Sequence, residues 1–161
     1  NRLKKIKFLS IKLWQNLNIS LPASWRYEID LKNKNLAAKV SGYEDAMLFI
    51  EGDNFFLPKQ FTTVSEYMQS LSSALKGQKD LSNVLLQSGS DNTFLISCYK
   101  KEKDEEEDVY LEHYFWHFFS YYNNVFYRLN FTYVFPENKD QFLHSLPSIL
   151  DNSIKSIEAK K

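Results

Sequence analysis

Two histidines in an aromatic segment are the first residues whose types and spacing could do chemistry. His113 and His117 lie four residues apart, and Glu112 precedes the first of them. On a helix this spacing would bring both imidazoles to one metal ion. On a strand, four residues span about 13 Å, which is too far for a shared ion. The neighbouring residues alternate as in a strand, so we predict packing histidines and no bound metal.

The other reactive side chains are isolated. Cys98 is the single cysteine, which excludes an internal disulfide, and no Lys, Arg or His is adjacent to activate its thiol. The acidic run 104–108 lacks the spaced ligands of a calcium loop, so we interpret it as a solvated tip, with docking of a basic partner as the alternative. His144 is expected to face solvent. The 4 glycines are scattered and neither G-x-S-x-G nor H-E-x-x-H occurs. We therefore expect no catalytic residue, no cofactor and no enzymatic activity.

The elements that position these residues centre on the segment 110–135. More than half of its residues are aromatic or histidine, and it contains no Gly or Pro. Two runs that alternate with period two are separated by Asn123-Asn124, and asparagine tolerates the positive φ of a tight turn. The pattern predicts a long β-hairpin. On its first strand Tyr114, Trp116 and Phe118 share one face.

The rest of the chain reads as strands and two helices. Residues 1–17 fit either a strand or a helical stripe that includes Leu3, with a basic membrane-surface helix as a further alternative. Alternation over 17–22, 27–31, 36–40 and 46–50 predicts a meander of three or four strands. A capping box of Thr63 and Glu66 begins a helix, and Gly77 is expected to end it in the left-handed conformation.

Two further strands, 84–87 and 93–99, precede a charged tip at 100–108. The last helix, within 138–157, has an apolar stripe and is expected to kink or restart at Pro147. We predict one α+β domain over 1–161, an α/β/α sandwich with an antiparallel sheet of about six to seven strands and two main helices. The expected core between sheet and helices comprises Tyr67, Leu71, Phe115, Phe119, Leu129, Phe131, Phe142, Leu146 and Ile154.

Composition limits the classes of function. Lys plus Arg and Asp plus Glu are both 20, so the formal net charge is zero, which argues against a nucleic-acid partner. No apolar run approaches about 18 residues, so no transmembrane segment is expected. The sequence leaves open the oligomeric state and the compartment, cytoplasmic or else periplasmic or secreted after processing.

The order of elements resembles the PsbP-like fold. The family's opening strand, proline and tryptophan are matched by LNISLPASW at 17–25, and its closing helix by SILDNSIKSI at 148–157. The family includes the photosystem PsbP subunit, the yeast Ran-binding nuclear-import factor, DcrB-type lipoproteins and the Eag chaperones of type VI secretion. The resemblance implies a sheet between helices and a binding or assembly role. The chain departs from the family pattern over residues 1–16 and at Ala23-Ser24, where a glycine is often found.

Aromatic density is the remaining functional signal. If both helices pack on the opposite face, the face of Trp116 stays partly open; the alternative is that the N-terminal segment covers it. Exposed aromatic residues with a polar rim are typical of an interface core. We therefore predict a non-catalytic protein-binding module of chaperone, adaptor or inhibitor (immunity) type, with a small apolar-ligand carrier or an enzyme of unrecognised type as alternatives. The predicted binding residues are Tyr114, Trp116, Phe118, Arg128 and Asn130.

Overall fold

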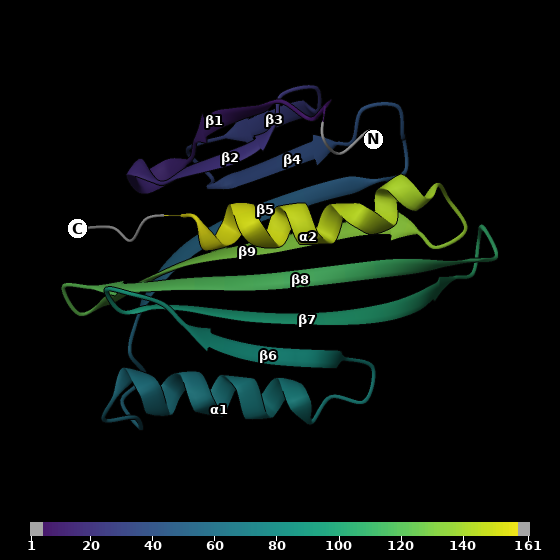
Figure 1. The fold of residues 1–161 in the computed structure, drawn as a ribbon. Helices are drawn as coiled ribbons and strands as arrows, with labels where there is room; N and C mark the ends of the chain where they lie inside the picture. The colour runs from purple at the N-terminus through teal and green to yellow at the C-terminus, as the bar shows by residue number, and fades with distance from the viewer. Residues whose placement is uncertain (1–4, 158–161) are drawn as a thin grey trace.

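The computed structural model describes residues 5–157, which form two antiparallel sheets and two α-helices (Figure 1). The large sheet has seven strands in the order β3-β4-β5-β9-β8-β7-β6, and β1 pairs with β2 in a separate two-stranded sheet. This confirms the predicted α+β class, the strand number and the two helices. The bounds are β1 (Phe8–Lys12), β2 (Asn18–Pro22), β3 (Arg26–Asp30), β4 (Asn35–Lys39), β5 (Met47–Phe56), α1 (Val64–Lys76), β6 (Ser82–Ser88), β7 (Thr93–Asp104), β8 (Val109–Tyr122), β9 (Val125–Pro136) and α2 (Gln141–Lys155).

The N-terminal segment is a strand followed by a 3₁₀ turn at Trp14–Asn16, so the helical alternatives are wrong for the residues described; Leu3 lies outside them. β2 confirms the predicted strand at 17–22, but it pairs with β1 and does not join the meander of the large sheet. Trp14 lies against Gly52 of β5, where an added Cβ would come 2.1 Å from the indole nitrogen. Only glycine leaves room there for the indole.

The long hairpin forms as predicted. β8 and β9 pair from Leu111↔Pro136 to Tyr122↔Val125. Asn123 and Asn124 both have positive φ, 50° and 66°, as a two-residue turn of the mirror-image type requires. Local sequence therefore set both the turn and the register of the pair.

α1 begins at the predicted capping residue, Thr63, but the Glu66 carboxylate bonds to Thr62 instead of the Thr63 N–H. The Thr63 hydroxyl accepts the N–H of Glu66 at 3.1 Å, and the Glu66 carboxylate accepts the hydroxyl of Thr62 at 2.9 Å. Gly77 was expected in the left-handed conformation, but its φ is −77°. The prediction for Gly77 is wrong because the helix ends in a right-handed turn, with the Gly77 N–H bonded to Ser73 O.

α2 runs without interruption through Pro147, so the expected kink or restart is wrong. Proline removes the N–H that would bond the carbonyl four residues earlier, which is Leu143 O. The Tyr133 hydroxyl donates to this carbonyl at 2.9 Å. A side chain of β9 thus replaces the missing helix bond. No helix within residues 5–157 is long and apolar enough to cross a membrane.

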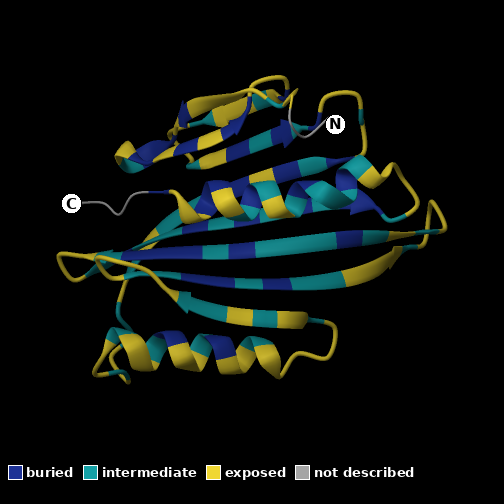
Figure 2. Cartoon of the chain, in the orientation of Figure 1, coloured by how far each residue is buried: buried dark blue, intermediate teal, exposed yellow. Residues whose placement is uncertain are grey.

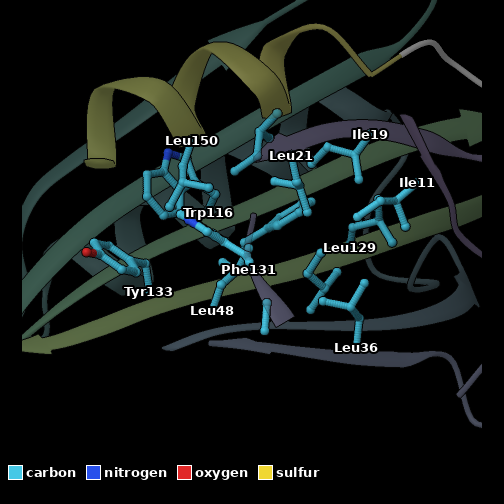
Figure 3. Packing of buried hydrophobic residues seen from close by; sticks show 14 of the residues in the cluster. Ile11, Ile19, Leu21, Leu36, Leu48, Trp116, Leu129, Phe131, Tyr133 and Leu150 are labelled. Atoms are coloured by element: carbon cyan, nitrogen blue, oxygen red, sulfur yellow. The ribbon is translucent and has the colours of Figure 1, made fainter. Parts of the chain in front are cut away.

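The two helices lie on opposite faces of the large sheet. α2 and the β1–β2 sheet pack on one face against Leu48, Phe131 and Tyr133 (Figure 3), whereas α1 packs on the other face against Phe119 and Phe126. Buried and exposed residues alternate along both helices (Figure 2). Of the expected core, Phe119, Leu129, Phe131, Leu146 and Ile154 are buried, and Tyr67, Leu71, Phe115 and Phe142 are partly buried.

Candidate functional site

The predicted open face around Trp116 is covered. Trp116 is 3% exposed, and its indole N–H donates to Asp151 Oδ1 of α2 at 3.1 Å. Figure 3 shows Trp116 beneath α2, next to Leu150. The expectation of an open face is wrong because α2 and the β1–β2 sheet share this face, while α1 alone takes the other. Phe118 is also buried, and Tyr114 is partly buried.

Arg128 and Asn130 do not join Tyr114 and Trp116. Trp116 pairs with Phe131, which puts Arg128 and Asn130 on the opposite face. Arg128 Nε donates to Asp53 Oδ1 at 2.8 Å, and this bond raises the pKa of the guanidinium. Asn130 Oδ1 lies 2.5 Å from His117 Nδ1. The five predicted site residues are therefore divided between two faces of the sheet.

The face opposite α2 has a region that no described helix covers. α1 packs along β6 and β7 and also reaches Phe55, Phe126 and Tyr121 near the β8–β9 turn. Towards the end of the sheet away from this turn, two rows of side chains cross β4, β5, β9 and β8 in register. We call these two rows the bare face. The first row is formed by Ala37, Phe49, Thr132 and Phe115. The second is formed by Met47, Val134 and His113, and Lys39 continues it on β4. None of these residues belongs to the two core clusters, the one packed beneath α2 and the β1–β2 sheet or the one packed beneath α1.

The bare face is unusually apolar for a solvent-facing sheet. Antiparallel sheets with one wet face normally place polar residues there. Here Phe49 is 38% exposed, and Met47, Phe115 and Val134 are partly exposed. The next row, by contrast, contains Asn35, Glu51 and Asn130.

The electrostatics of the bare face are those of a neutral surface with basic margins. Burial, followed by the charge of Lys100, lowers the pKa of His113, so this imidazole is neutral at pH 7. Lys100 lies 5.9 Å from the Phe115 ring centroid and pairs with Glu102 at 3.3 Å. On the opposite margin, Lys39 pairs with Glu44 at 3.3 Å. These exposed ion pairs are weak and exchangeable.

Sequence reasoning did not single out Met47 and Phe49. The signal was present, because the run 46–50 is apolar on both faces of a strand. Leu48 and Ile50 fill the core under α2, which leaves Met47 and Phe49 to point the other way. A continuous apolar run on a strand that is buried on one face only therefore indicates exposed apolar side chains on its other face.

Partly buried polar groups near α2 bond the helix to the large sheet. The Tyr99 hydroxyl donates to Glu112 Oε1 at 2.9 Å, and His144 Nδ1 lies 3.3 Å from the other carboxylate oxygen. His144 Nε2 lies 2.9 Å from Glu137 O. The expectation that His144 faces solvent is wrong, because one ring nitrogen contacts the carboxylate of Glu112 on β8 and the other contacts the carbonyl of Glu137 just after β9. This network joins α2 to β7 and β8.

The histidines and the cysteine considered as reactive residues lie in ordinary structural positions. His113 and His117 lie on a strand, as expected. Within residues 5–157 no group of three or more His, Cys, Asp or Glu could hold a metal ion. Cys98 is buried, and burial raises the pKa of its thiol to about 11, so the reactive thiolate is disfavoured at neutral pH.

A shallow hollow of about 290 Å³ lies between β7 and α2. Its lining includes Ser97, Tyr99, Tyr114, Ser148 and Asp151. Asp151 already accepts the Trp116 N–H and pairs with Lys155 at 2.7 Å. The carboxylate of this hollow is thus neutralised within the chain.

Comparison with known proteins shows the fold. No protein-family model and no curated protein matches the sequence. The structure resembles LpqN of Mycobacterium tuberculosis, described as involved in cell envelope biogenesis, with a TM-score of 0.59 and 8% identity over 94% of this chain and 91% of that one. It also resembles a protein of Bacteroides thetaiotaomicron, with a TM-score of 0.52 and 16% identity over 90% of this chain, which spans 45% of that protein's length. At these identities the likenesses show a shared α+β fold alone.

Proposed function

We propose that this chain is a non-catalytic protein-binding module with a PsbP-like fold, and that it binds an apolar helix of a partner protein on the bare face. The observation that carries this proposal is the row of Phe49 and Phe115, beside Met47 and Val134, outside both core clusters. Contiguous apolar surface of this kind is the usual mark of a docking site. Chaperone, adaptor and inhibitor are all roles that such a surface can serve.

The dimensions suit a helix. Neighbouring strands are ~4.8 Å apart, so the row from Ala37 to Phe115 spans about 14 Å across four strands. A helix with its side chains is about 10–12 Å wide. The two rows lie two residues apart along each strand, which is about 7 Å, so one helix laid along the rows would cover both of them.

The margins indicate the chemistry of that helix. Lys39 and Lys100 lie at opposite ends of the row that contains Met47. Their present partners, Glu44 and Glu102, are exposed glutamates of the same chain. A partner helix with an apolar stripe flanked by carboxylates would replace these weak pairs. The role described for LpqN in cell envelope biogenesis is compatible with a non-catalytic module of this kind.

A site-specific photocrosslinker tests the proposal. The photoreactive analogue benzoylphenylalanine is placed at Phe49 in one variant and at Phe56 in another. Phe56 is the matched control, because it is the same residue type on the same strand and is more exposed than Phe49. We expect crosslinks from position 49 to an apolar helix of one protein, and none to that helix from position 56.

The captured partner is then purified and titrated by calorimetry. Loss of a central aromatic anchor costs about 2 kcal/mol, which corresponds to roughly 30-fold in Kd. Phe49→Gln should show this loss and Phe56→Gln should not. Equal affinities of both variants and the unmodified chain would contradict the bare face as the binding site.

A further inference from the structure

The two edge strands of the large sheet differ in how well they are shielded from pairing with another chain. β6 at one edge has an irregular register between Ser82 and Leu85 and is packed against α1. β3 at the other edge has β4 as its only described strand neighbour, without a bulge. An edge strand presents unpaired backbone N–H and C=O groups that can pair with another chain.

Exposed apolar side chains accompany the β3 edge. Ile29 is 43% exposed, and Leu31, which follows the strand, is 55% exposed. Phe8 of β1 is also exposed, and β1 lies at the same margin of the molecule as β3 (Figure 1). Sheet edges that must stay solvated usually avoid such residues.

β3 carries one basic residue, Arg26, followed by two acidic ones, Glu28 and Asp30, and its Arg26 and Glu28 have weak partners or none within the described residues. Arg26 is directly opposite Lys39 of β4, an unfavourable cross-strand pair. Its nearest carboxylate is Glu44 at 3.9 Å, with both side chains largely exposed. Glu28 is opposite Ala37, and no ion pair of Glu28 is recorded within residues 5–157.

We propose that a second copy of this chain pairs with it, β3 against β3 in antiparallel orientation, with Tyr27 on the two-fold axis. In this register Arg26 is opposite Glu28 of the partner copy, twice, and Trp25 is opposite Ile29. Shifting the centre to Glu28 puts two glutamates opposite each other, and centring on Ile29 puts Glu28 opposite Asp30. Centring on Arg26 opposes two arginines. Among registers that are centred on a residue of β3 and keep like faces together, the Tyr27-centred one alone forms attractive charge pairs without a repulsive one.

The assembly extends beyond the proposed function. A two-fold axis perpendicular to the sheet joins the two large sheets into one continuous sheet, with identical contacts from each copy. Both bare faces then lie on the same side. The dimer would therefore present two docking surfaces in one plane, next to each other across the β3 pair.

A charge-swap series measured by sedimentation tests the dimer. The 161-residue chain is compared with Arg26→Glu, Glu28→Arg and the double variant, with circular dichroism melts to confirm folding. Each single substitution makes two like-charge pairs, so we expect at least about a tenfold rise in the dimer Kd. The double variant restores both attractive pairs and should restore the dimer. Phe49→Gln is the control, since it leaves the β3 edge unchanged and should leave the dimer intact.

Each outcome of the sedimentation series either supports or overturns the proposed dimer. A chain that stays monomeric up to millimolar concentration overturns the proposal, as does a dimer that both single variants leave unchanged. A double variant that stays monomeric also overturns it, because the register centred on Tyr27 requires rescue. Failure of the dimer leaves the helix-binding test at Phe49 unaffected, so the two proposals fail separately.

Discussion

The Tyr133 hydroxyl donates a hydrogen bond of 2.9 Å to the carbonyl of Leu143, the group that Pro147 leaves without its helix partner. Tyr133 is fully buried on β9 and lies in the middle of the core under α2. A helix with an internal proline stays continuous because the sheet satisfies the orphaned carbonyl. The same bond fixes the position of α2 along the strand.

Tyr133→Phe should therefore destabilise the fold. The variant keeps the ring and leaves a buried carbonyl without a donor, which costs about 1–3 kcal/mol. Chemical denaturation measures this loss. Pro147→Ala supplies an N–H to the same carbonyl, so Tyr133→Phe should cost less in the Pro147→Ala background. Equal costs in the two backgrounds would contradict the pairing.

Trp116→Ala should act on the fold. Its side chain is enclosed beneath α2, and truncation of a buried aromatic residue costs about 3–5 kcal/mol. Phe56→Ala, at a strongly exposed position, should stay within about 0.5 kcal/mol of the unmodified chain. Urea denaturation of both variants checks the difference. An unchanged free energy of unfolding for Trp116→Ala would show that α2 does not cover this ring.

Gly52→Ala should displace Trp14. The new methyl group would overlap the indole, and overpacking of this kind costs about 1–3 kcal/mol. Gly77→Ala is the matched control, because Gly77 has an ordinary φ and its added Cβ would lie 3.5 Å from its nearest neighbour. We expect a lower melting temperature for Gly52→Ala only. A similar melting temperature for the two variants would place Trp14 elsewhere.

Stability should fall in mild acid through His117. Burial lowers the pKa of this imidazole below about 6.5, the unfolded value, and outweighs the opposing hydrogen bond to Asn130. The unfolded chain therefore takes up the proton first. The stabilisation is fully present above about pH 6.5 and is lost as the pH falls through the folded pKa. His117→Gln removes this contribution, so its free energy of unfolding should fall less between about pH 7 and pH 5. A parallel pH dependence in both proteins would contradict the assignment.

Local sequence was enough to predict the fold class and most elements. The Asn123-Asn124 turn, the capping box of Thr63 and Glu66, and the apolar stripe of α2 each depend on residues close together in the chain. Prediction failed at Gly77 because the helix ends in a right-handed turn, and at Pro147 because a neighbouring group supplied the bond that the rule assumed to be missing. For Pro147 that group is Tyr133, ten residues from the carbonyl it binds.

The candidate site could be predicted only in part. The density of aromatic residues on β8 and β9 led us to predict an aromatic sheet face that binds a protein partner. Trp116 was expected on that open face, but it lies on the face that α2 covers. Both faces of β8 are rich in aromatic residues, so period-two alternation sorts them into two sets without saying which set a helix covers. The pairing register then separated Arg128 and Asn130 from Trp116, because a shift of one residue exchanges the faces of a strand.

The sequence by itself determined most of the strands, the Asn123-Asn124 turn, the two helices and the two alternating sets of side chains on β8 and β9, because these follow from contacts within a few residues. It left the N-terminal segment open between strand and helix. Only the tertiary structure decided that α2 and the β1–β2 sheet cover Trp116, while α1 covers part of the opposite face and leaves Phe49 and Phe115 outside. Coverage depends on where elements distant in the chain cross the sheet, and that crossing is set by the sum of packing over the whole core.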